Sequence, residues 1–126
     1  MYNPLKVIIA KLFAGNEAHL LFHLYNFVDT QSLVSAVRRI PYCDGNTNTT
    51  GGLRFARTEI FNAANGDRSD VPDVIVLITD GEPNREVDTL DDEVRRIQNL
   101  GIRIVVLGVD TSVSAYSTTI SFLTYS

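Results

Sequence analysis

This sequence has very few sulfur-containing residues and lacks tryptophan. Its 126 residues include one cysteine, one methionine and no tryptophan. The lone Cys43 cannot form an internal disulfide, so cysteine usage leaves the redox compartment open. Its neighbours Tyr42 and Asp44 include no cation that would stabilise a thiolate, so an unreactive thiol in a turn is the simplest interpretation.

Positive charge is also in short supply. Eleven Lys and Arg residues stand against fifteen Asp and Glu residues, giving a net charge of −4. Nucleic acid is therefore not an expected partner, because phosphate binding needs a basic patch and the pair Arg38-Arg39 is too small to make one. No stretch is apolar for long enough to span a bilayer. The short run Lys6-Val-Ile-Ile-Ala10 is interrupted by Lys11 and predicts a strand rather than an export signal.

The length suits one domain over residues 1–126, with one core. Its most informative segment is Val74-Ile-Val-Leu-Ile78, which ends at Thr79-Asp80-Gly81. An unbroken aliphatic run bounded by turn residues is typical of a parallel strand covered on both faces. Ligands of open α/β sheets bind beyond the carboxyl ends of such strands. Asp80 therefore lies where a sheet of this kind does its chemistry.

The rest of the chain alternates between strand and helix patterns. Residues 6–13 and 18–24 predict two strands joined by a short turn, which makes an antiparallel hairpin. A helix begins after Asp29 and ends before Pro41, and a second begins near Gly51 and ends at Asn65-Gly66. The second helix has an apolar stripe of Leu53, Ala56 and Ile60.

A third helix is capped by Thr89 and followed by Gly101, with a strand over residues 102–109 after it. Its expected buried face consists of Leu90, Val94, Ile97 and Leu100. The tail, 110–126, is rich in Ser and Thr and shows no period. This order predicts the α/β class: a doubly wound, mostly parallel sheet with an antiparallel edge hairpin and right-handed crossovers.

Two polar loops are expected to reach the same edge of that sheet. Thr47, Thr49 and Thr50 precede the second helix, and Asp80 follows the central strand. Hydroxyl and carboxylate oxygens are the hard ligands that suit Mg²⁺ or Mn²⁺. The alternative is that Asp80 only caps a turn and that Thr47 only holds its own loop by local hydrogen bonds.

Several motifs in a fixed order resemble the von Willebrand factor A domain, in the style of matrilins and non-fibrillar collagens such as type VI. They are Asn46-Thr-Asn-Thr-Thr-Gly-Gly-Leu53, Asn65-Gly-Asp-Arg68, Val76-Leu-Ile-Thr-Asp-Gly-Glu82 and Gly101-Ile-Arg-Ile-Val-Val-Leu-Gly-Val109. The resemblance covers roughly residues 6–112, and the combination is far more specific than any one motif.

The resemblance implies a metal-ion-dependent adhesion site in which Thr47 and Asp80 are ligands. The family's Asp-x-Ser-x-Ser segment, on its first and central strand, would fall upstream of Lys6. The resemblance therefore implies a truncated domain that lacks this strand and stops before the last helix and strand. Asp110-Thr-Ser-Val-Ser114 spells the same pattern, but it lies after the wrong strand and is interpreted as a chance match.

The implied function is a non-enzymatic, secreted protein-binding module for cell adhesion or extracellular matrix. It would hold protein partners, collagen among the candidates, through Mg²⁺ or Mn²⁺ bridged to a partner carboxylate. A truncated or degenerate domain without metal binding is the alternative. A hydrolase using Asp80 is the third interpretation, and it is weakened because the sequence has no nucleophile elbow and no phosphate-binding loop with a lysine.

Overall fold

The structure is a computed structural model that describes residues 10–12, 18–21, 27–40, 46–79, 86–109 and 121–125. Its strands are β1 (Ala10–Leu12), β2 (Ala18–Leu20), β3 (Val74–Thr79), β4 (Arg103–Val109) and β5 (Ser121–Tyr125). Its α-helices are α1 (Thr30–Arg38), α2 (Thr49–Phe55) and α3 (Leu90–Asn99). A π-helical turn, η1 (Ala56–Ile60), extends α2, and two 3-10 turns follow at Ala63–Asn65 and Val87–Thr89.

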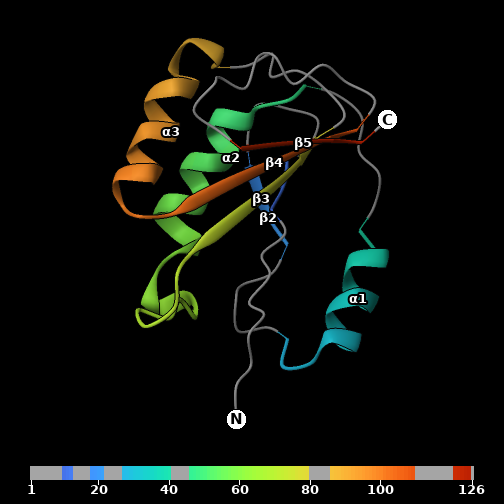
Figure 1. The fold of residues 1–126 in the computed structure, drawn as a ribbon. Helices are drawn as coiled ribbons and strands as arrows, with labels where there is room; N and C mark the ends of the chain where they lie inside the picture. Colours follow the sequence, from blue (N-terminus) through green and yellow to red (C-terminus); the bar gives the residue numbers. More distant parts are fainter. Residues whose placement is uncertain are drawn as a thin grey trace.

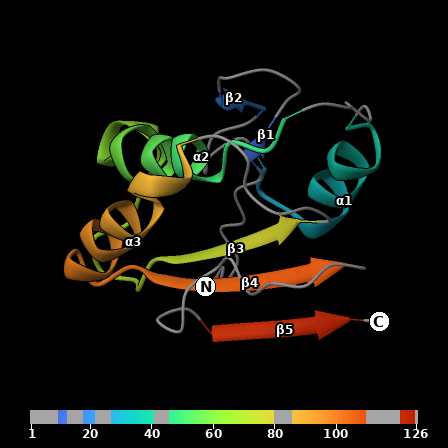
Figure 2. The same cartoon turned by 90° about the horizontal axis from the view of Figure 1, so that it is seen from above.

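The strands form two separate sheets in the part of the chain that is described. Strands β1 and β2 pair antiparallel, with Ala10 opposite Leu20, which confirms the predicted hairpin. Strands β3, β4 and β5 form a parallel sheet in that order, with Val76 opposite Val105 and Val106 opposite Phe122. Figures 1 and 2 show the hairpin beyond β3, on the side away from β4. The tail was expected to contain no further strand, and β5 corrects this.

The core lies between one face of the parallel sheet and the helices α2 and α3 (Figure 2). Alternate residues of the strands reach this face, as the two-residue period of a strand requires. Buried side chains of the core are Leu53, Leu90, Val94, Ile97, Ile102, Ile104 and Val106, with Ile75, Leu77 and Phe61 packed against them. Ala56 and Ile60 form a second buried cluster, against which Ile75 also packs. The predicted stripes of the second and third helices are thus confirmed except at one position.

That exception is Leu100, which was predicted to be buried and is 64% exposed. Helix α3 ends at Asn99, and Leu100 is its C-cap with a φ of −82°. The next residue, Gly101, has a φ of 79° and turns the chain toward β4. Leu100 therefore falls outside the last helical turn, where the 3.6-residue period no longer decides which way a side chain points.

Helix α2 also differs from the prediction at both ends. It begins at Thr49 rather than near Gly51, because the Asn48 side chain caps it by accepting a hydrogen bond from the Gly51 amide at 2.8 Å. Its α-helical geometry ends at Phe55, and the chain continues as η1 rather than as an α-helix to Asn65. Gly66 then turns the chain with a φ of 91°.

The other face of β3 contradicts the expectation of a strand covered on both sides. Val74, Val76 and Ile78 are 46%, 57% and 65% exposed. Both α2 and α3 pack on the opposite face, and α1 has no buried residue. Among the described residues, no helix covers this second face. No described helix is long and apolar enough to cross a membrane.

A buried carboxylate joins α2 and η1 to α3. The side chain of Glu93 is 2% exposed, and its Oε1 accepts a hydrogen bond from Arg57 Nε at 2.5 Å. Arg57 Nη2 reaches Glu93 Oε2 at 3.3 Å, and Arg54 and Arg96 approach the same carboxylate at 4.0 Å and 3.9 Å. The hydrogen bond to Glu93 raises the pKa of Arg57. The charge of Glu93 is thus balanced inside a water-poor site, as a buried carboxylate requires.

The substitution Glu93→Gln should destabilise the fold by about 2 kcal/mol, because it leaves Arg57 facing a neutral group in a largely buried position. Urea unfolding followed by circular dichroism measures this change. Asp92→Asn is the matched control, since Asp92 is 69% exposed and lies 4.0 Å from Arg95; it should change the free energy of unfolding by less than about 0.5 kcal/mol. Equal effects of the two substitutions would contradict the assignment.

Candidate metal and partner-binding rim

The loop before α2 is built around the amide of Asn48, which is 2% exposed. Its Oδ1 accepts from the Gly51 amide, and its Nδ2 donates to Glu86 Oε1 at 3.2 Å. A Cβ on Gly51 would lie 2.8 Å from Asn48 Nδ2, so glycine is required there for the cap to close. Both ends of the buried amide are used, and the loop is fixed to the segment that precedes α3.

Glu86 is the hydrogen-bond acceptor in this contact between the loop and the segment before α3. Its φ of 49° lies in the left-handed region that non-glycine residues rarely adopt. Its carbonyl accepts hydrogen bonds from Thr50 Oγ1 at 2.9 Å and from Thr89 Oγ1 at 3.0 Å. Its carboxylate accepts from Arg54 Nη2 at 2.7 Å. These contacts hold the strained backbone in place and account for the use of glutamate where glycine would cost less.

The electrostatics of this contact follow from its hydrogen bonds. Arg54, then Asn48, lower the pKa of the Glu86 carboxyl from its ordinary value of 4.5. The ion pair also neutralises Arg54, whose side chain is 43% exposed and belongs to the helix that follows the loop. The loop therefore has no unbalanced guanidinium from this helix beside it, which leaves the surroundings open to a cation.

Of the two ligands predicted from the sequence, the structure describes Thr47 and does not describe Asp80. Thr47 is half-buried and directly precedes Asn48. Asp80 lies outside the described residues, as do Asp110 and Ser114, so whether Thr47 and Asp80 meet stays a prediction. Strand β3 ends at Thr79, one residue before Asp80. Within the described segments, no three His, Cys, Asp or Glu side chains gather in a way that could hold a metal ion.

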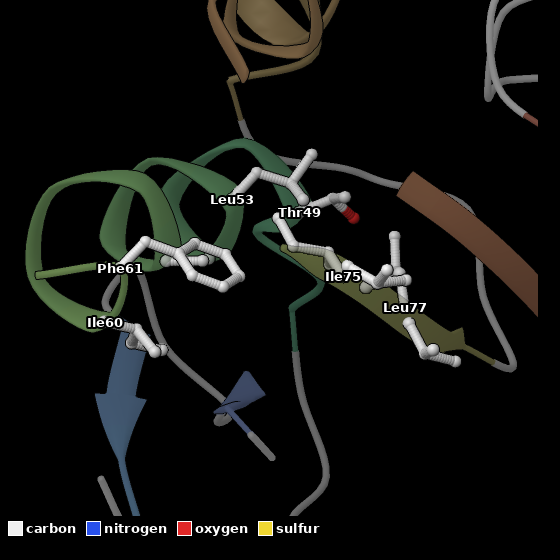
Figure 3. Close-up of a pocket in the computed structure, with 10 residues that line it drawn as sticks. Thr49, Leu53, Ile60, Phe61, Ile75 and Leu77 are labelled. Atoms are coloured by element: carbon white, nitrogen blue, oxygen red, sulfur yellow. The ribbon is translucent and has the colours of Figure 1, made fainter. Parts of the chain in front are cut away.

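An apolar groove lies between the helical segment α2–η1 and β3 (Figure 3). Leu53, Ile60 and Phe61 line it from the helical side, and Ile75 and Leu77 line it from the strand. Thr49, at the first turn of α2, is also part of the lining. The start of α2 and strand β3 therefore line the same groove.

The sequence analysis missed three residues that join the loop before α2 and the α2–η1 segment to α3 and the segment before it. They are Glu86, Glu93 and Arg57. A signal was present for two of them. Glu93 is three residues after Leu90 and four before Ile97, so it shares their helix face. Arg57 is four residues after Leu53 and borders the apolar stripe. Nothing in the local sequence marks Glu86, because its role depends on contacts with residues more than thirty positions away.

The sequence matches the profile of the von Willebrand factor type A domain over residues 3–122. The chain belongs to this family. The von Willebrand A assignment confirms the resemblance and the α/β fold class predicted from the motifs.

Curated relatives of this von Willebrand A domain include matrilin-1 from Homo sapiens, 35% identical over 91 residues, which are 70% of this chain and 18% of that protein. Matrilin-1 from Gallus gallus is 32% identical over 73% of this chain and 18% of its own length. The collagen alpha-4(VI) chain of Mus musculus is 32% identical over 63% of this chain and 3% of its own length. The chain thus spans less than a fifth of the length of each of these three relatives.

Solved structures carry the same fold. Proximal thread matrix protein 1 from the mussel byssus superposes with a TM-score of 0.76 at 20% identity, over 87% of this chain and 30% of that one. The same mussel protein with a zinc-occupied MIDAS motif gives a TM-score of 0.77 at 21% identity, over 90% of this chain and 30% of its own. At such identities the likeness concerns the fold of the von Willebrand A domain alone.

The lowered pKa of Glu86 predicts a specific acid sensitivity. A carboxyl whose pKa is lower in the folded state stabilises the fold above its unfolded pKa, and this contribution is lost as the pH falls through the folded value. Between pH 7 and pH 3, the unsubstituted protein should therefore lose more stability than Glu86→Gln. The difference should be under about 1 kcal/mol because the pair is partly exposed.

Urea unfolding at several pH values measures this difference, and the exposed Glu59→Gln serves as the control. That variant should keep the pH dependence of the unsubstituted protein. Parallel curves for the unsubstituted protein and Glu86→Gln would contradict a stabilising contact of the Glu86 carboxylate with Arg54.

Proposed function

We propose that this chain is a non-enzymatic protein-binding domain of the extracellular matrix or of cell adhesion, which binds its partners at the rim formed by the loop before α2 and the loop after β3. A divalent ion, Mg²⁺ or Mn²⁺, would be held there by Thr47 and Asp80. Its open positions would accept a carboxylate from the partner, a chemistry that a hard cation with neutral hydroxyl ligands favours. Collagen or other matrix proteins are the partner class suggested by the relatives.

The observation that carries this proposal is the fixed position of the loop at residues 46–50. Asn48, Thr49 and Thr50 are buried, with exposed fractions of 2%, 0% and 0%. Hydrogen bonds tie Asn48 and Thr50 to Glu86 and tie Asn48 to the first turn of α2, so the residue that directly follows Thr47 is held in place. Preorganised ligands reduce the entropy that ion binding costs.

The proposed ligands are of the chemical type that Mg²⁺ and Mn²⁺ prefer. A hydroxyl and a carboxylate are hard oxygen donors, and the Arg54–Glu86 ion pair leaves no unbalanced cation from α2 to repel Mg²⁺. Two protein ligands leave most of the six positions around Mg²⁺ to water or to the partner. The ion is therefore expected to bind weakly alone and more tightly when a partner carboxylate completes its ligands.

The absence of enzymatic activity is part of the proposal. The rim offers a carboxylate and hydroxyls, and its described part pairs no histidine or cysteine nucleophile with a base. The secreted location is supported by the kinship with matrilin-1 and the collagen alpha-4(VI) chain. The competing function is a degenerate domain that keeps the fold and binds no ion.

A titration of Mg²⁺ or Mn²⁺ followed by thermal unfolding tests the metal site. An ion that binds the folded state should raise the Tm with ion concentration, by about 3–6 °C at ten times its Kd. Thr47→Val and Asp80→Ala should each abolish this rise. Asp88→Ala is the matched control, since Asp88 is an exposed acid on the 3-10 turn before α3, and it should leave the rise unchanged.

A Tm that does not respond to either ion would favour the degenerate domain. A response lost equally in Asp80→Ala and Asp88→Ala would indicate diffuse attraction of cations to acidic residues, and the ligand assignment would be wrong.

A further inference from the structure

One modification motif of the sequence lies in the loop before α2. Asn48-Thr49-Thr50 has the pattern Asn-x-Thr, which marks an acceptor for an N-linked glycan in a secreted protein. No other asparagine of the 126 residues is followed two positions later by Ser or Thr. Such a motif is expected on an exposed loop, because the transferase must reach the asparagine.

The structure buries the whole motif. The exposed fractions of Asn48, Thr49 and Thr50 are 2%, 0% and 0%. The nitrogen that would carry the glycan, Asn48 Nδ2, donates to Glu86 Oε1 at 3.2 Å, and Thr50 Oγ1 donates to the Glu86 carbonyl at 2.9 Å. Thr49 and Thr50 already belong to the first turn of α2. The folded chain therefore offers a transferase neither the amide nitrogen nor the hydroxyl of the motif.

The space around this nitrogen is also filled. The Asn48 amide lies so close to Gly51 that a single Cβ there would be 2.8 Å from Nδ2. A sugar ring is far larger than a methyl group, so a glycan on Nδ2 would have to displace Glu86 and the start of α2. The cap at the Gly51 amide would be lost with them. A glycan on Asn48 and the native loop therefore exclude each other.

We propose that Asn48 is an N-glycan acceptor in the unfolded chain alone, so that glycosylation and folding compete for the same side chain. In the reaction, Nδ2 forms a bond to C1 of the first sugar of an oligosaccharide carried on a polyprenyl diphosphate. The bond from C1 to the phosphate oxygen breaks, the polyprenyl diphosphate leaves, and the Nδ2 proton passes to a base of the transferase. The exclusion rests on the contacts of Asn48, and its biological setting rests on the secreted location in the proposed function.

The sequence separation of the hydrogen-bonded partners determines when the acceptor becomes hidden. Glu86 lies 38 residues after Asn48. A chain that enters a secretory compartment during synthesis therefore exposes Asn48 before the segment with Glu86 is there to cover it. A glycan added in that interval leaves a chain that cannot close the loop before α2.

The first experiment translates the whole chain, preceded by a cleavable signal peptide, in a cell-free system with endoplasmic-reticulum microsomes. We expect a product with one glycan, seen as a mobility shift that a peptide-N-glycosidase reverses. Thr50→Val removes the motif and should abolish the shift. An excess of a short acceptor peptide suppresses the transfer and supplies the unmodified chain for comparison. Limited proteolysis should degrade the glycosylated chain faster by a factor of about ten or more, because its loop cannot form.

The second experiment offers the purified folded chain to the solubilised transferase and its lipid-linked oligosaccharide. Glycan transfer should be slower than to a peptide of residues 45–52 by a factor of about ten or more, because the folded loop must open first. Ala64→Thr is the matched control, since it creates the same motif at Asn62, which is exposed. That variant should accept one glycan in the folded state, at Asn62 rather than at Asn48.

Three outcomes would overturn the inference. The chain carries no glycan after translation into microsomes, the glycosylated and unmodified chains resist protease equally, or the folded chain accepts a glycan as fast as the peptide does. Neither experiment measures ion binding. These outcomes would therefore leave the proposed metal site intact, and a chain that binds no ion would leave the inference standing.

Discussion

The hydrogen bonds of one buried amide determine where the central helix of this protein begins. Asn48 caps α2 through its oxygen and reaches Glu86 through its nitrogen. The helix so started carries Leu53, Ala56 and Ile60 into the core and contacts the hairpin, β3 and α3. Every described layer around the parallel sheet therefore depends on the position of this one helix start. Since caps contribute about 1 kcal/mol each, the geometry that the cap imposes matters more here than its energy.

Charge pairing secures the same helix from its other face. Arg54 binds Glu86 at the rim, and Arg57 binds the buried Glu93 one turn further along. Both arginines belong to the helical segment that follows the loop. Glu86 lies in the segment that leads into α3, and Glu93 lies in α3 itself. The apolar stripe alone allows a helix to slide or rotate on a sheet, because the hydrophobic effect has no direction. Paired hydrogen bonds from guanidinium to carboxylate do have direction, so they fix the register of α2 against α3.

Periodic segments of the sequence predicted most of this fold. The spacing of Leu53, Ala56 and Ile60 identified α2, and the hairpin and the β3–β4 pair followed from apolar runs and turn residues. The pattern failed where its period stops, as at Leu100, and where no local feature exists, as at Glu86. The strand β5 was missed because its alternation is short and lies in a tail rich in Ser and Thr. Features such as the role of Glu86 and the pairing of β5 depend on contacts between segments that are distant in the sequence, and local composition does not reveal them.

The candidate site was likewise predicted in part from the sequence, and the rest of it is seen only in the structure. Thr47 and Asp80 were named as ligands from the motifs and their order. The hydrogen bonds that hold Asn48 and Thr50 beside Thr47 are seen only in the structure, because both residues bond to Glu86, which lies 38 and 36 residues away from them.

The aliphatic side chains of β3 are more exposed than their sequence predicts. An unbroken aliphatic run is expected where both faces of a strand are covered, and here Val76 and Ile78 are more than half exposed. Full burial of an aliphatic side chain contributes about 1.5–3 kcal/mol, and each of these two side chains forgoes roughly half of it. Among the described residues, β3 also has one edge without a pairing strand. An exposed aliphatic face and an unpaired strand edge both favour association.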